Sequence, residues 1–128
     1  MAKRYCILVL GAHRSGTSAL TRVINLLGAA LPKNLMPPSP NNNEAGFWEP
    51  QNLWLLHDRM LREAGSRWDD WRKLVLSALP SDRFRHYKAE IGRLIADEYG
   101  GARLIVLKEP AHLSFCAALY RAAGRARI

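Results

Sequence analysis

The 128-residue chain lacks several features that define large protein classes. It has no run of eighteen apolar residues, which excludes a membrane-crossing helix. It has only two cysteines, Cys6 and Cys116, and their apolar surroundings favour buried free thiols over a disulfide framework. It also lacks internal repeats, low-complexity tracts and any recognised nucleic-acid-binding motif. No small-residue cleavage site follows the apolar N-terminal stretch, so we expect a cytoplasmic protein.

Acidic residues are absent from the first third of the chain. Residues 1–43 contain five Lys and Arg and no Asp or Glu, whereas residues 44–110 contain eleven residues of each sign. Three arginines in the tail complete the net charge of +8. This distribution favours a local anion site near the N-terminus over a basic stripe that would bind nucleic acid.

Apolar patterning predicts strands that alternate with helices. Tyr5–Leu10 and Leu104–Leu107 are continuous apolar runs with β-branched members, which is typical of buried parallel strands. Apolar residues at helical spacing predict four helices. They contain Leu20–Leu27, the segment from Pro50 to Gly65, the segment from Ser81 or Asp82 to Gly100, and Leu113–Tyr120. A short helix is also possible within Asp70–Leu79.

Two features indicate an α/β domain of which this chain forms only a part. Ala30–Asn43 contains four prolines and three consecutive asparagines, which predicts a long surface loop. Residues 125–128 resemble the approach to a third strand. Because a two-stranded sheet rarely stands alone, we expect residues 1–128 to be the N-terminal portion of a longer domain with a parallel sheet.

The segment Gly11–Ser18, between the first predicted strand and helix, has the pattern of an anion-binding loop. Its two glycines, five positions apart, permit a tight turn whose N–H groups point inward, and the helix N-terminus adds positive potential. Nucleotide-hydrolysing loops need Lys directly after the second glycine, but Thr17 has that position and the basic residue is Arg14. No aspartate is evident at the end of the second strand to help hold Mg²⁺. The pattern therefore predicts an anion site that needs no metal.

Arg14–Ser18, after a hydrophobic strand, resembles the 5′-phosphosulfate-binding loop of sulfotransferases. Further stretches resemble the bacterial branch of that family, in the same order: Gly46–Pro50, Leu56–Asp58 with Trp68–Trp71, and Leu107–Pro110. The resemblance covers most of residues 5–115. It implies a P-loop NTPase-like three-layer fold with a parallel sheet. The family's 3′-phosphate site, on and after the next strand, lies outside residues 1–128.

The resemblance also implies a reaction and its donor. A sulfuryl group would pass from 3′-phosphoadenosine 5′-phosphosulfate to a hydroxyl or amine of an acceptor, without a metal; sugar, lipid, peptide and small phenol all remain open as the acceptor. The loop residues would bind the donor's 5′-phosphosulfate: Arg14, Ser15, Gly16, Thr17 and Ser18. Arg14 would in addition stabilise charge on the leaving phosphate, and Lys108 would approach the transferring sulfuryl group.

A general base must also take the acceptor's proton. Glu49 is the first candidate, Glu44 the second and His112 the third. The alternative role for Glu49 is that of a favourable charge near the start of the helix at Pro50. The family usually has Arg after Lys-Asp/Glu-Pro, and Ala111 stands there in this chain, so one cationic contact is expected to be missing.

Two other functions remain open at this point, namely a P-loop nucleotide kinase with a degenerate lysine and a non-catalytic basic module that binds nucleic acid. The aromatic residues Trp48, Trp54, Trp68 and Trp71 fit a core better than an acceptor site. Trp68 and Trp71 nevertheless flank two aspartates and could wall an acceptor cleft. His57 and Asp58 are interpreted as structural or acceptor-lining, and His86 as a surface residue.

Overall fold

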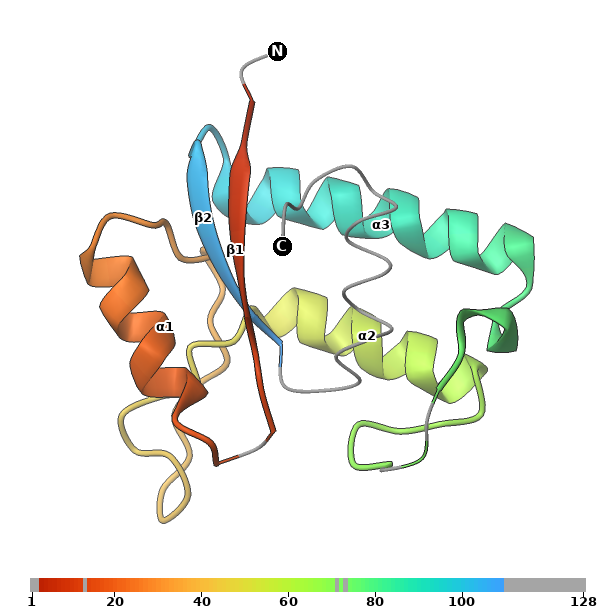
Figure 1. Ribbon diagram of the computed structural model, residues 1–128, viewed down its shortest axis with the longest axis horizontal. Coiled ribbons are helices and arrows are strands. Elements are labelled where there is room, and N and C mark those ends of the chain that lie inside the picture. Colours follow the sequence, from red (N-terminus) through yellow and green to blue (C-terminus); the bar gives the residue numbers. More distant parts are fainter. Residues whose placement is uncertain (1–2, 13, 71, 73, 110–128) are drawn as a thin grey trace.

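Two parallel strands lie at the centre of the structure, a computed structural model that describes residues 3–12, 14–70, 72 and 74–109 (Figure 1). The elements are β1 (Tyr5–Leu10), α1 (Thr17–Leu26), α2 (Gln51–Glu63), a short 3₁₀ helix η1 (Leu76–Ala78), α3 (Ser81–Tyr99) and β2 (Leu104–Glu109). β1 pairs with β2 in parallel, from Tyr5 opposite Leu104 to Leu10 opposite Glu109. The α/β class, both strands and the first three predicted helices are confirmed. The helix predicted over Leu113–Tyr120 and the strand expected near 125–128 lie outside the described residues.

Side chains of the two strands alternate between two packed layers. On one face, Cys6, Ile105 and Leu107 pack with α2 and α3 in the main core. On the other face, Val9 and Val106 pack with residues of α1 and the segment after it. Figure 1 shows α1 on the opposite side of the sheet from α2 and α3. Cys6 is a buried free cysteine, as predicted, and burial raises the pKa of its thiol to about 12, against a smaller lowering by the Arg4 charge.

α1 buries its threonines rather than its leucines. Thr17 and Thr21 are buried, and the Thr21 hydroxyl donates a hydrogen bond to the Thr17 carbonyl at 2.7 Å. Leu20 and Leu27, from the apolar pattern that predicted this helix, are more than half exposed. A sheet only two strands wide covers a narrow strip of the helix, so most of the apolar stripe stays uncovered by the described residues.

The segment Ala30–Asn43 forms no helix or strand, as predicted, but its first part is anchored to the core. Glu98 of α3 is only 3% exposed. Its carboxylate accepts hydrogen bonds from the Asn34 backbone at 2.9 Å, from the Asn34 side chain at 3.0 Å and from the Asn52 side chain. Burial raises the pKa of Glu98, but these bonds and the Lys33 charge outweigh it and lower the pKa overall. The anchor fixes the path that brings residues 42–49 to the N-terminal part of α1.

None of the helices in the described ranges combines the length and the apolar character needed to cross a lipid bilayer.

Candidate anion-binding site

The loop between β1 and α1 has the tight geometry that its glycines predict. Arg14 and Gly16 have left-handed backbones, with φ of 62° and 84°. A side chain at Gly16 would therefore strain the turn into α1. Gly11 is needed for a different reason, because a Cβ there would lie 2.6 Å from Thr17 Cγ2 and 2.9 Å from Ser15 Oγ. The two glycines thus allow the chain to turn directly into the N-terminus of α1, where backbone N–H groups favour anions.

The two hydroxyl groups at the start of α1 have different roles. Ser18 Oγ donates to the Phe47 carbonyl at 3.2 Å and accepts from Asn43 Nδ2 at 3.3 Å and from Lys108 Nζ at 2.9 Å. This uses its one hydrogen and both lone pairs. The Thr17 hydroxyl lines the cavity beside it and has no hydrogen-bond partner among the described residues. In this structure Ser18 joins α1 to the segment 43–47, whereas the Thr17 hydroxyl can donate a hydrogen bond to a ligand in the cavity.

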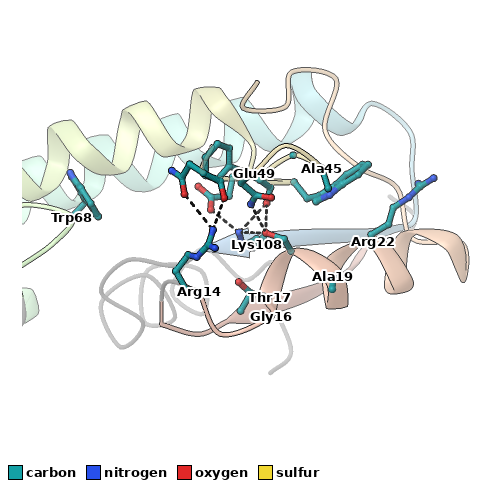
Figure 2. Close-up of a pocket in the computed structure, with 15 residues that line it drawn as sticks. Arg14, Gly16, Thr17, Ala19, Arg22, Ala45, Glu49, Trp68 and Lys108 are labelled. Carbon is teal, nitrogen blue, oxygen red and sulfur yellow. Dashed lines mark hydrogen bonds and ion pairs between the residues drawn. The ribbon is translucent and has the colours of Figure 1, made fainter. Parts of the chain in front are cut away.

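Lys108 joins three parts of the chain at the carboxyl end of β2, where open parallel sheets place their ligands. Its Nζ lies 2.8 Å from Glu49 Oε1, 2.9 Å from Ser18 Oγ and 2.9 Å from the Phe47 carbonyl oxygen (Figure 2). Each of the three ammonium hydrogens therefore has an acceptor. The sequence-predicted residues Lys108, Glu49 and Ser18 thus meet at one point.

Glu49 supplies the negative charge that a buried ammonium requires. The side chains of Lys108 and Glu49 are only 5% and 6% exposed. An unpaired charge at such a depth would be strongly unfavourable. The residue before Glu49, Trp48, has φ of 60°, a region that bulky residues rarely adopt, so the surroundings must hold this segment firmly.

Of the other candidate bases, Glu44 is exposed and does not line the cavity. His112 lies outside the described residues. Among the candidate bases that the structure describes, Glu49 alone faces the cavity.

A cavity of about 740 Å³ opens over this cluster, within the usual range for ligand pockets. The residues that line it come from the loop and α1, from the segment 42–49, and from two single positions: Arg14, Gly16, Thr17, Ser18, Ala19, Arg22, Asn42, Asn43, Ala45, Gly46, Phe47, Trp48, Glu49, Trp68 and Lys108. The lining holds three cations and one carboxylate, and that carboxylate is paired with Lys108.

Arg14 reaches across the cavity to neutral atoms. Its Nη1 donates to the Asn42 carbonyl oxygen at 2.7 Å and to Asn42 Oδ1 at 3.3 Å (Figure 2). No carboxylate whose side chain the structure describes forms an ion pair with Arg14 or Arg22. The positive charge of the cavity is therefore available to an anion.

The tryptophans that the structure describes are more exposed than a core role predicts. Trp48 and Trp54 are half-buried, and Trp68 is 41% exposed and lines the cavity. The core interpretation is wrong for Trp68, because its segment crosses the surface between α2 and η1. Trp71 lies outside the described residues.

Sequence reasoning missed the pairing of Arg22 with Trp48. The Arg22 Cζ lies 5.0 Å from the centroid of the Trp48 ring, and both residues line the cavity. One signal was present, because Arg22 is four positions after Ser18 and so lies on the same face of α1.

The histidines of the described part do not contribute to this cavity. His57 is buried in α2, in keeping with a structural role. His86 is exposed and its Nε2 lies 3.0 Å from Glu90 Oε2, as expected for a surface residue. Within residues 3–109, where the structure describes them, no group of three or more His, Cys, Asp or Glu could hold a metal ion.

Comparisons of the chain with protein-family models, with curated proteins and with solved structures found no significant match.

Proposed function

We propose that the chain carries the 5′-phosphosulfate-binding part of a sulfotransferase that uses 3′-phosphoadenosine 5′-phosphosulfate, within a P-loop NTPase-like fold. One observation carries this proposal. The four stretches that resemble the family are separate in the sequence, yet each contributes residues to the same cavity: Arg14 and Gly16–Ser18, Gly46–Glu49, Trp68 and Lys108. Ser15, also predicted for this site, does not line the cavity, and its hydroxyl donates to the Ala12 carbonyl oxygen. Such convergence is expected if the stretches together form one binding site.

The donor's phosphosulfate would lie at the N-terminus of α1. Backbone N–H groups of the loop and the Thr17 hydroxyl would donate hydrogen bonds to it. Arg14 now donates to neutral oxygens of Asn42, and an anion would offer it a stronger, charged acceptor. There Arg14 would stabilise the negative charge that develops on the phosphate oxygen as its bond to sulfur breaks.

Glu49 and Lys108 would act at the acceptor side of the same sulfur. The acceptor oxygen forms the new bond to sulfur while its proton passes to a Glu49 carboxylate oxygen, and adenosine 3′,5′-bisphosphate leaves. The ion pair with Lys108 keeps a carboxylate in this place. Since all three Lys108 hydrogens already have acceptors, a sulfuryl oxygen must displace one of them, and the neutral Ser18 or Phe47 oxygen is displaced more easily than Glu49.

The proposal is tested by calorimetry of the chain with adenosine 3′,5′-bisphosphate and with ATP, each with and without Mg²⁺. We expect the bisphosphate to bind without Mg²⁺, and Arg14→Gln to weaken it about tenfold or more through the lost charge-assisted hydrogen bonds. Arg85→Gln removes the same charge from an exposed position on α3 and serves as the control.

Two outcomes would contradict the proposal. ATP binding that requires Mg²⁺, with no affinity for the bisphosphate, would favour a nucleotide kinase. Nucleic-acid binding that falls steeply with salt and does not depend on Arg14 would favour a basic binding module.

A further inference from the structure

One of the three cations that line the cavity, Arg22, has no role in the proposed function. Arg22 lies on α1 about 6 Å of helix rise beyond Ser18, one turn further from the loop. Its guanidinium carbon lies over the Trp48 ring, 5.0 Å from the ring centroid, and both side chains line the cavity. Figure 2 shows Arg22 and Trp68 at opposite ends of the view, with Lys108 between them.

The charge of Arg22 is not compensated nearby. The guanidinium makes one hydrogen bond among the described residues, from Nη1 to Asn25 Oδ1. Residues 1–43 contain no acid, so no carboxylate of the loop or of α1 can neutralise it. A guanidinium over an indole can still donate through the N–H groups in its plane, and those that Asn25 does not use can pair with the two oxygens of a carboxylate. The pair therefore presents a flat apolar surface beside an anion-binding edge.

Trp48 is held in place by its neighbours. Lys108 Nζ binds the residue on each side of it, at 2.9 Å from the Phe47 carbonyl oxygen and 2.8 Å from Glu49 Oε1. The left-handed backbone of Trp48, with φ of 60°, persists because these contacts fix it. The ring is thus positioned before any ligand arrives, which lowers the entropic cost of binding.

We infer that Arg22 and Trp48 form the acceptor subsite, and that the acceptor is a hydroxylated ring compound that bears a carboxylate. The carboxylate would bind the Arg22 edge, the ring would pack against Trp48, and the hydroxyl would reach the Glu49–Lys108 pair. Ser18, which binds Lys108 Nζ, and Arg22 are one helical turn apart on α1, so the two parts of the subsite follow one another along the same helix. This inference rests on the proposed function, since it assigns the acceptor of that reaction.

The test compares matched probes that differ in one carboxylate. D-glucuronate is measured against D-glucose, and 4-hydroxybenzoate against 4-hydroxybenzyl alcohol, by ligand-observed NMR titration. We expect the carboxylate member of at least one pair to bind about tenfold or more tightly. Arg22→Gln should abolish that difference, whereas Arg85→Gln should preserve it. The pair that shows the difference identifies a sugar or an aromatic acceptor.

Three results would overturn the inference. The first two are equal binding of both members in each probe pair, and a carboxylate preference that survives Arg22→Gln. The third is a loss of adenosine 3′,5′-bisphosphate affinity in Arg22→Gln as large as the loss in Arg14→Gln. The last result would place Arg22 in the donor site. If the bisphosphate does not bind at all but the Arg22-dependent preference remains, the proposed function fails and the carboxylate subsite stands. Arg22 is exposed, and circular dichroism of Arg22→Gln verifies that the variant is folded.

Discussion

The buried pair of Lys108 and Glu49 should be a strong determinant of stability. Lys108→Met leaves the Glu49 carboxylate, 6% exposed, without its cation at 2.8 Å. Removing one partner of a buried ion pair costs about 3–5 kcal/mol. Domains are stable by about 5–15 kcal/mol in total, so this one substitution should remove a large share. Glu49→Gln should cost less, because the amide oxygen can still accept a hydrogen bond from the ammonium.

The coupling is measured by urea unfolding of the two single variants and of the double variant Lys108→Met/Glu49→Gln, followed by circular dichroism. We expect the double variant to lose at least about 2 kcal/mol less than the sum of the single losses, because it buries no charge. The exposed pair Arg93–Asp97 on α3, with a nitrogen–oxygen distance of 3.3 Å, is the control. Its coupling should be about 0.3–0.5 kcal/mol. Additivity of the Lys108 and Glu49 losses within about 0.5 kcal/mol would refute the reasoning.

Three further substitutions test other parts of the structure. Gly11→Ala places a methyl group 2.6 Å from an α1 side-chain carbon and should cost about 1–3 kcal/mol in urea unfolding, whereas Gly101→Ala, with open space around it, should cost little. Glu98→Gln should destabilise the chain at pH 7. The pKa of Glu98 is lowered in the folded state. Its carboxylate therefore stabilises the fold at pH values above its unfolded-state pKa, and this stabilisation is lost as the pH falls through its folded-state pKa. The free energies of unfolding of the original chain and of Glu98→Gln should therefore converge in acid. Cys6, with a pKa of about 12, should be ionised in about one molecule in 10⁴ at pH 8. In the variant Cys116→Ser, where Cys6 is the remaining cysteine, the chain should therefore react with a disulfide reagent only after urea is added.

The strands and helices were predictable because their signals are local. The apolar runs Tyr5–Leu10 and Leu104–Leu107 and the helical spacing before Gly28, Gly65 and Gly100 each lie within one element. The buried face of α1 was not predictable. Its leucines have the spacing of a core stripe, but the face that is covered depends on how wide the sheet is, and no pattern within the helix contains that information.

That some residues of the candidate site would meet was predictable, but their connections were not. Parallel pairing brings the carboxyl end of β2 beside the loop after β1, so a meeting of Lys108 with the loop follows from the topology. The role of Ser18 does not, because its hydrogen bonds depend on Asn43 and Phe47. Those residues belong to a loop whose path is set by the distant Glu98 anchor.

The connections of Lys108 also define what anion binding must change. In this structure its ammonium and the Ser18 hydroxyl are fully hydrogen-bonded. An incoming oxyanion therefore gains no unused donor from either group and must break an existing bond first. Arg14 and Thr17 require a smaller exchange, since Arg14 binds only neutral oxygens and the Thr17 hydroxyl has no partner among the described residues. Initial capture of an anion should thus depend on Arg14, Thr17 and the loop N–H groups. On the proposed function, Lys108 would engage afterwards, when a charged oxygen replaces Ser18 or the Phe47 carbonyl while Glu49 retains its ion pair.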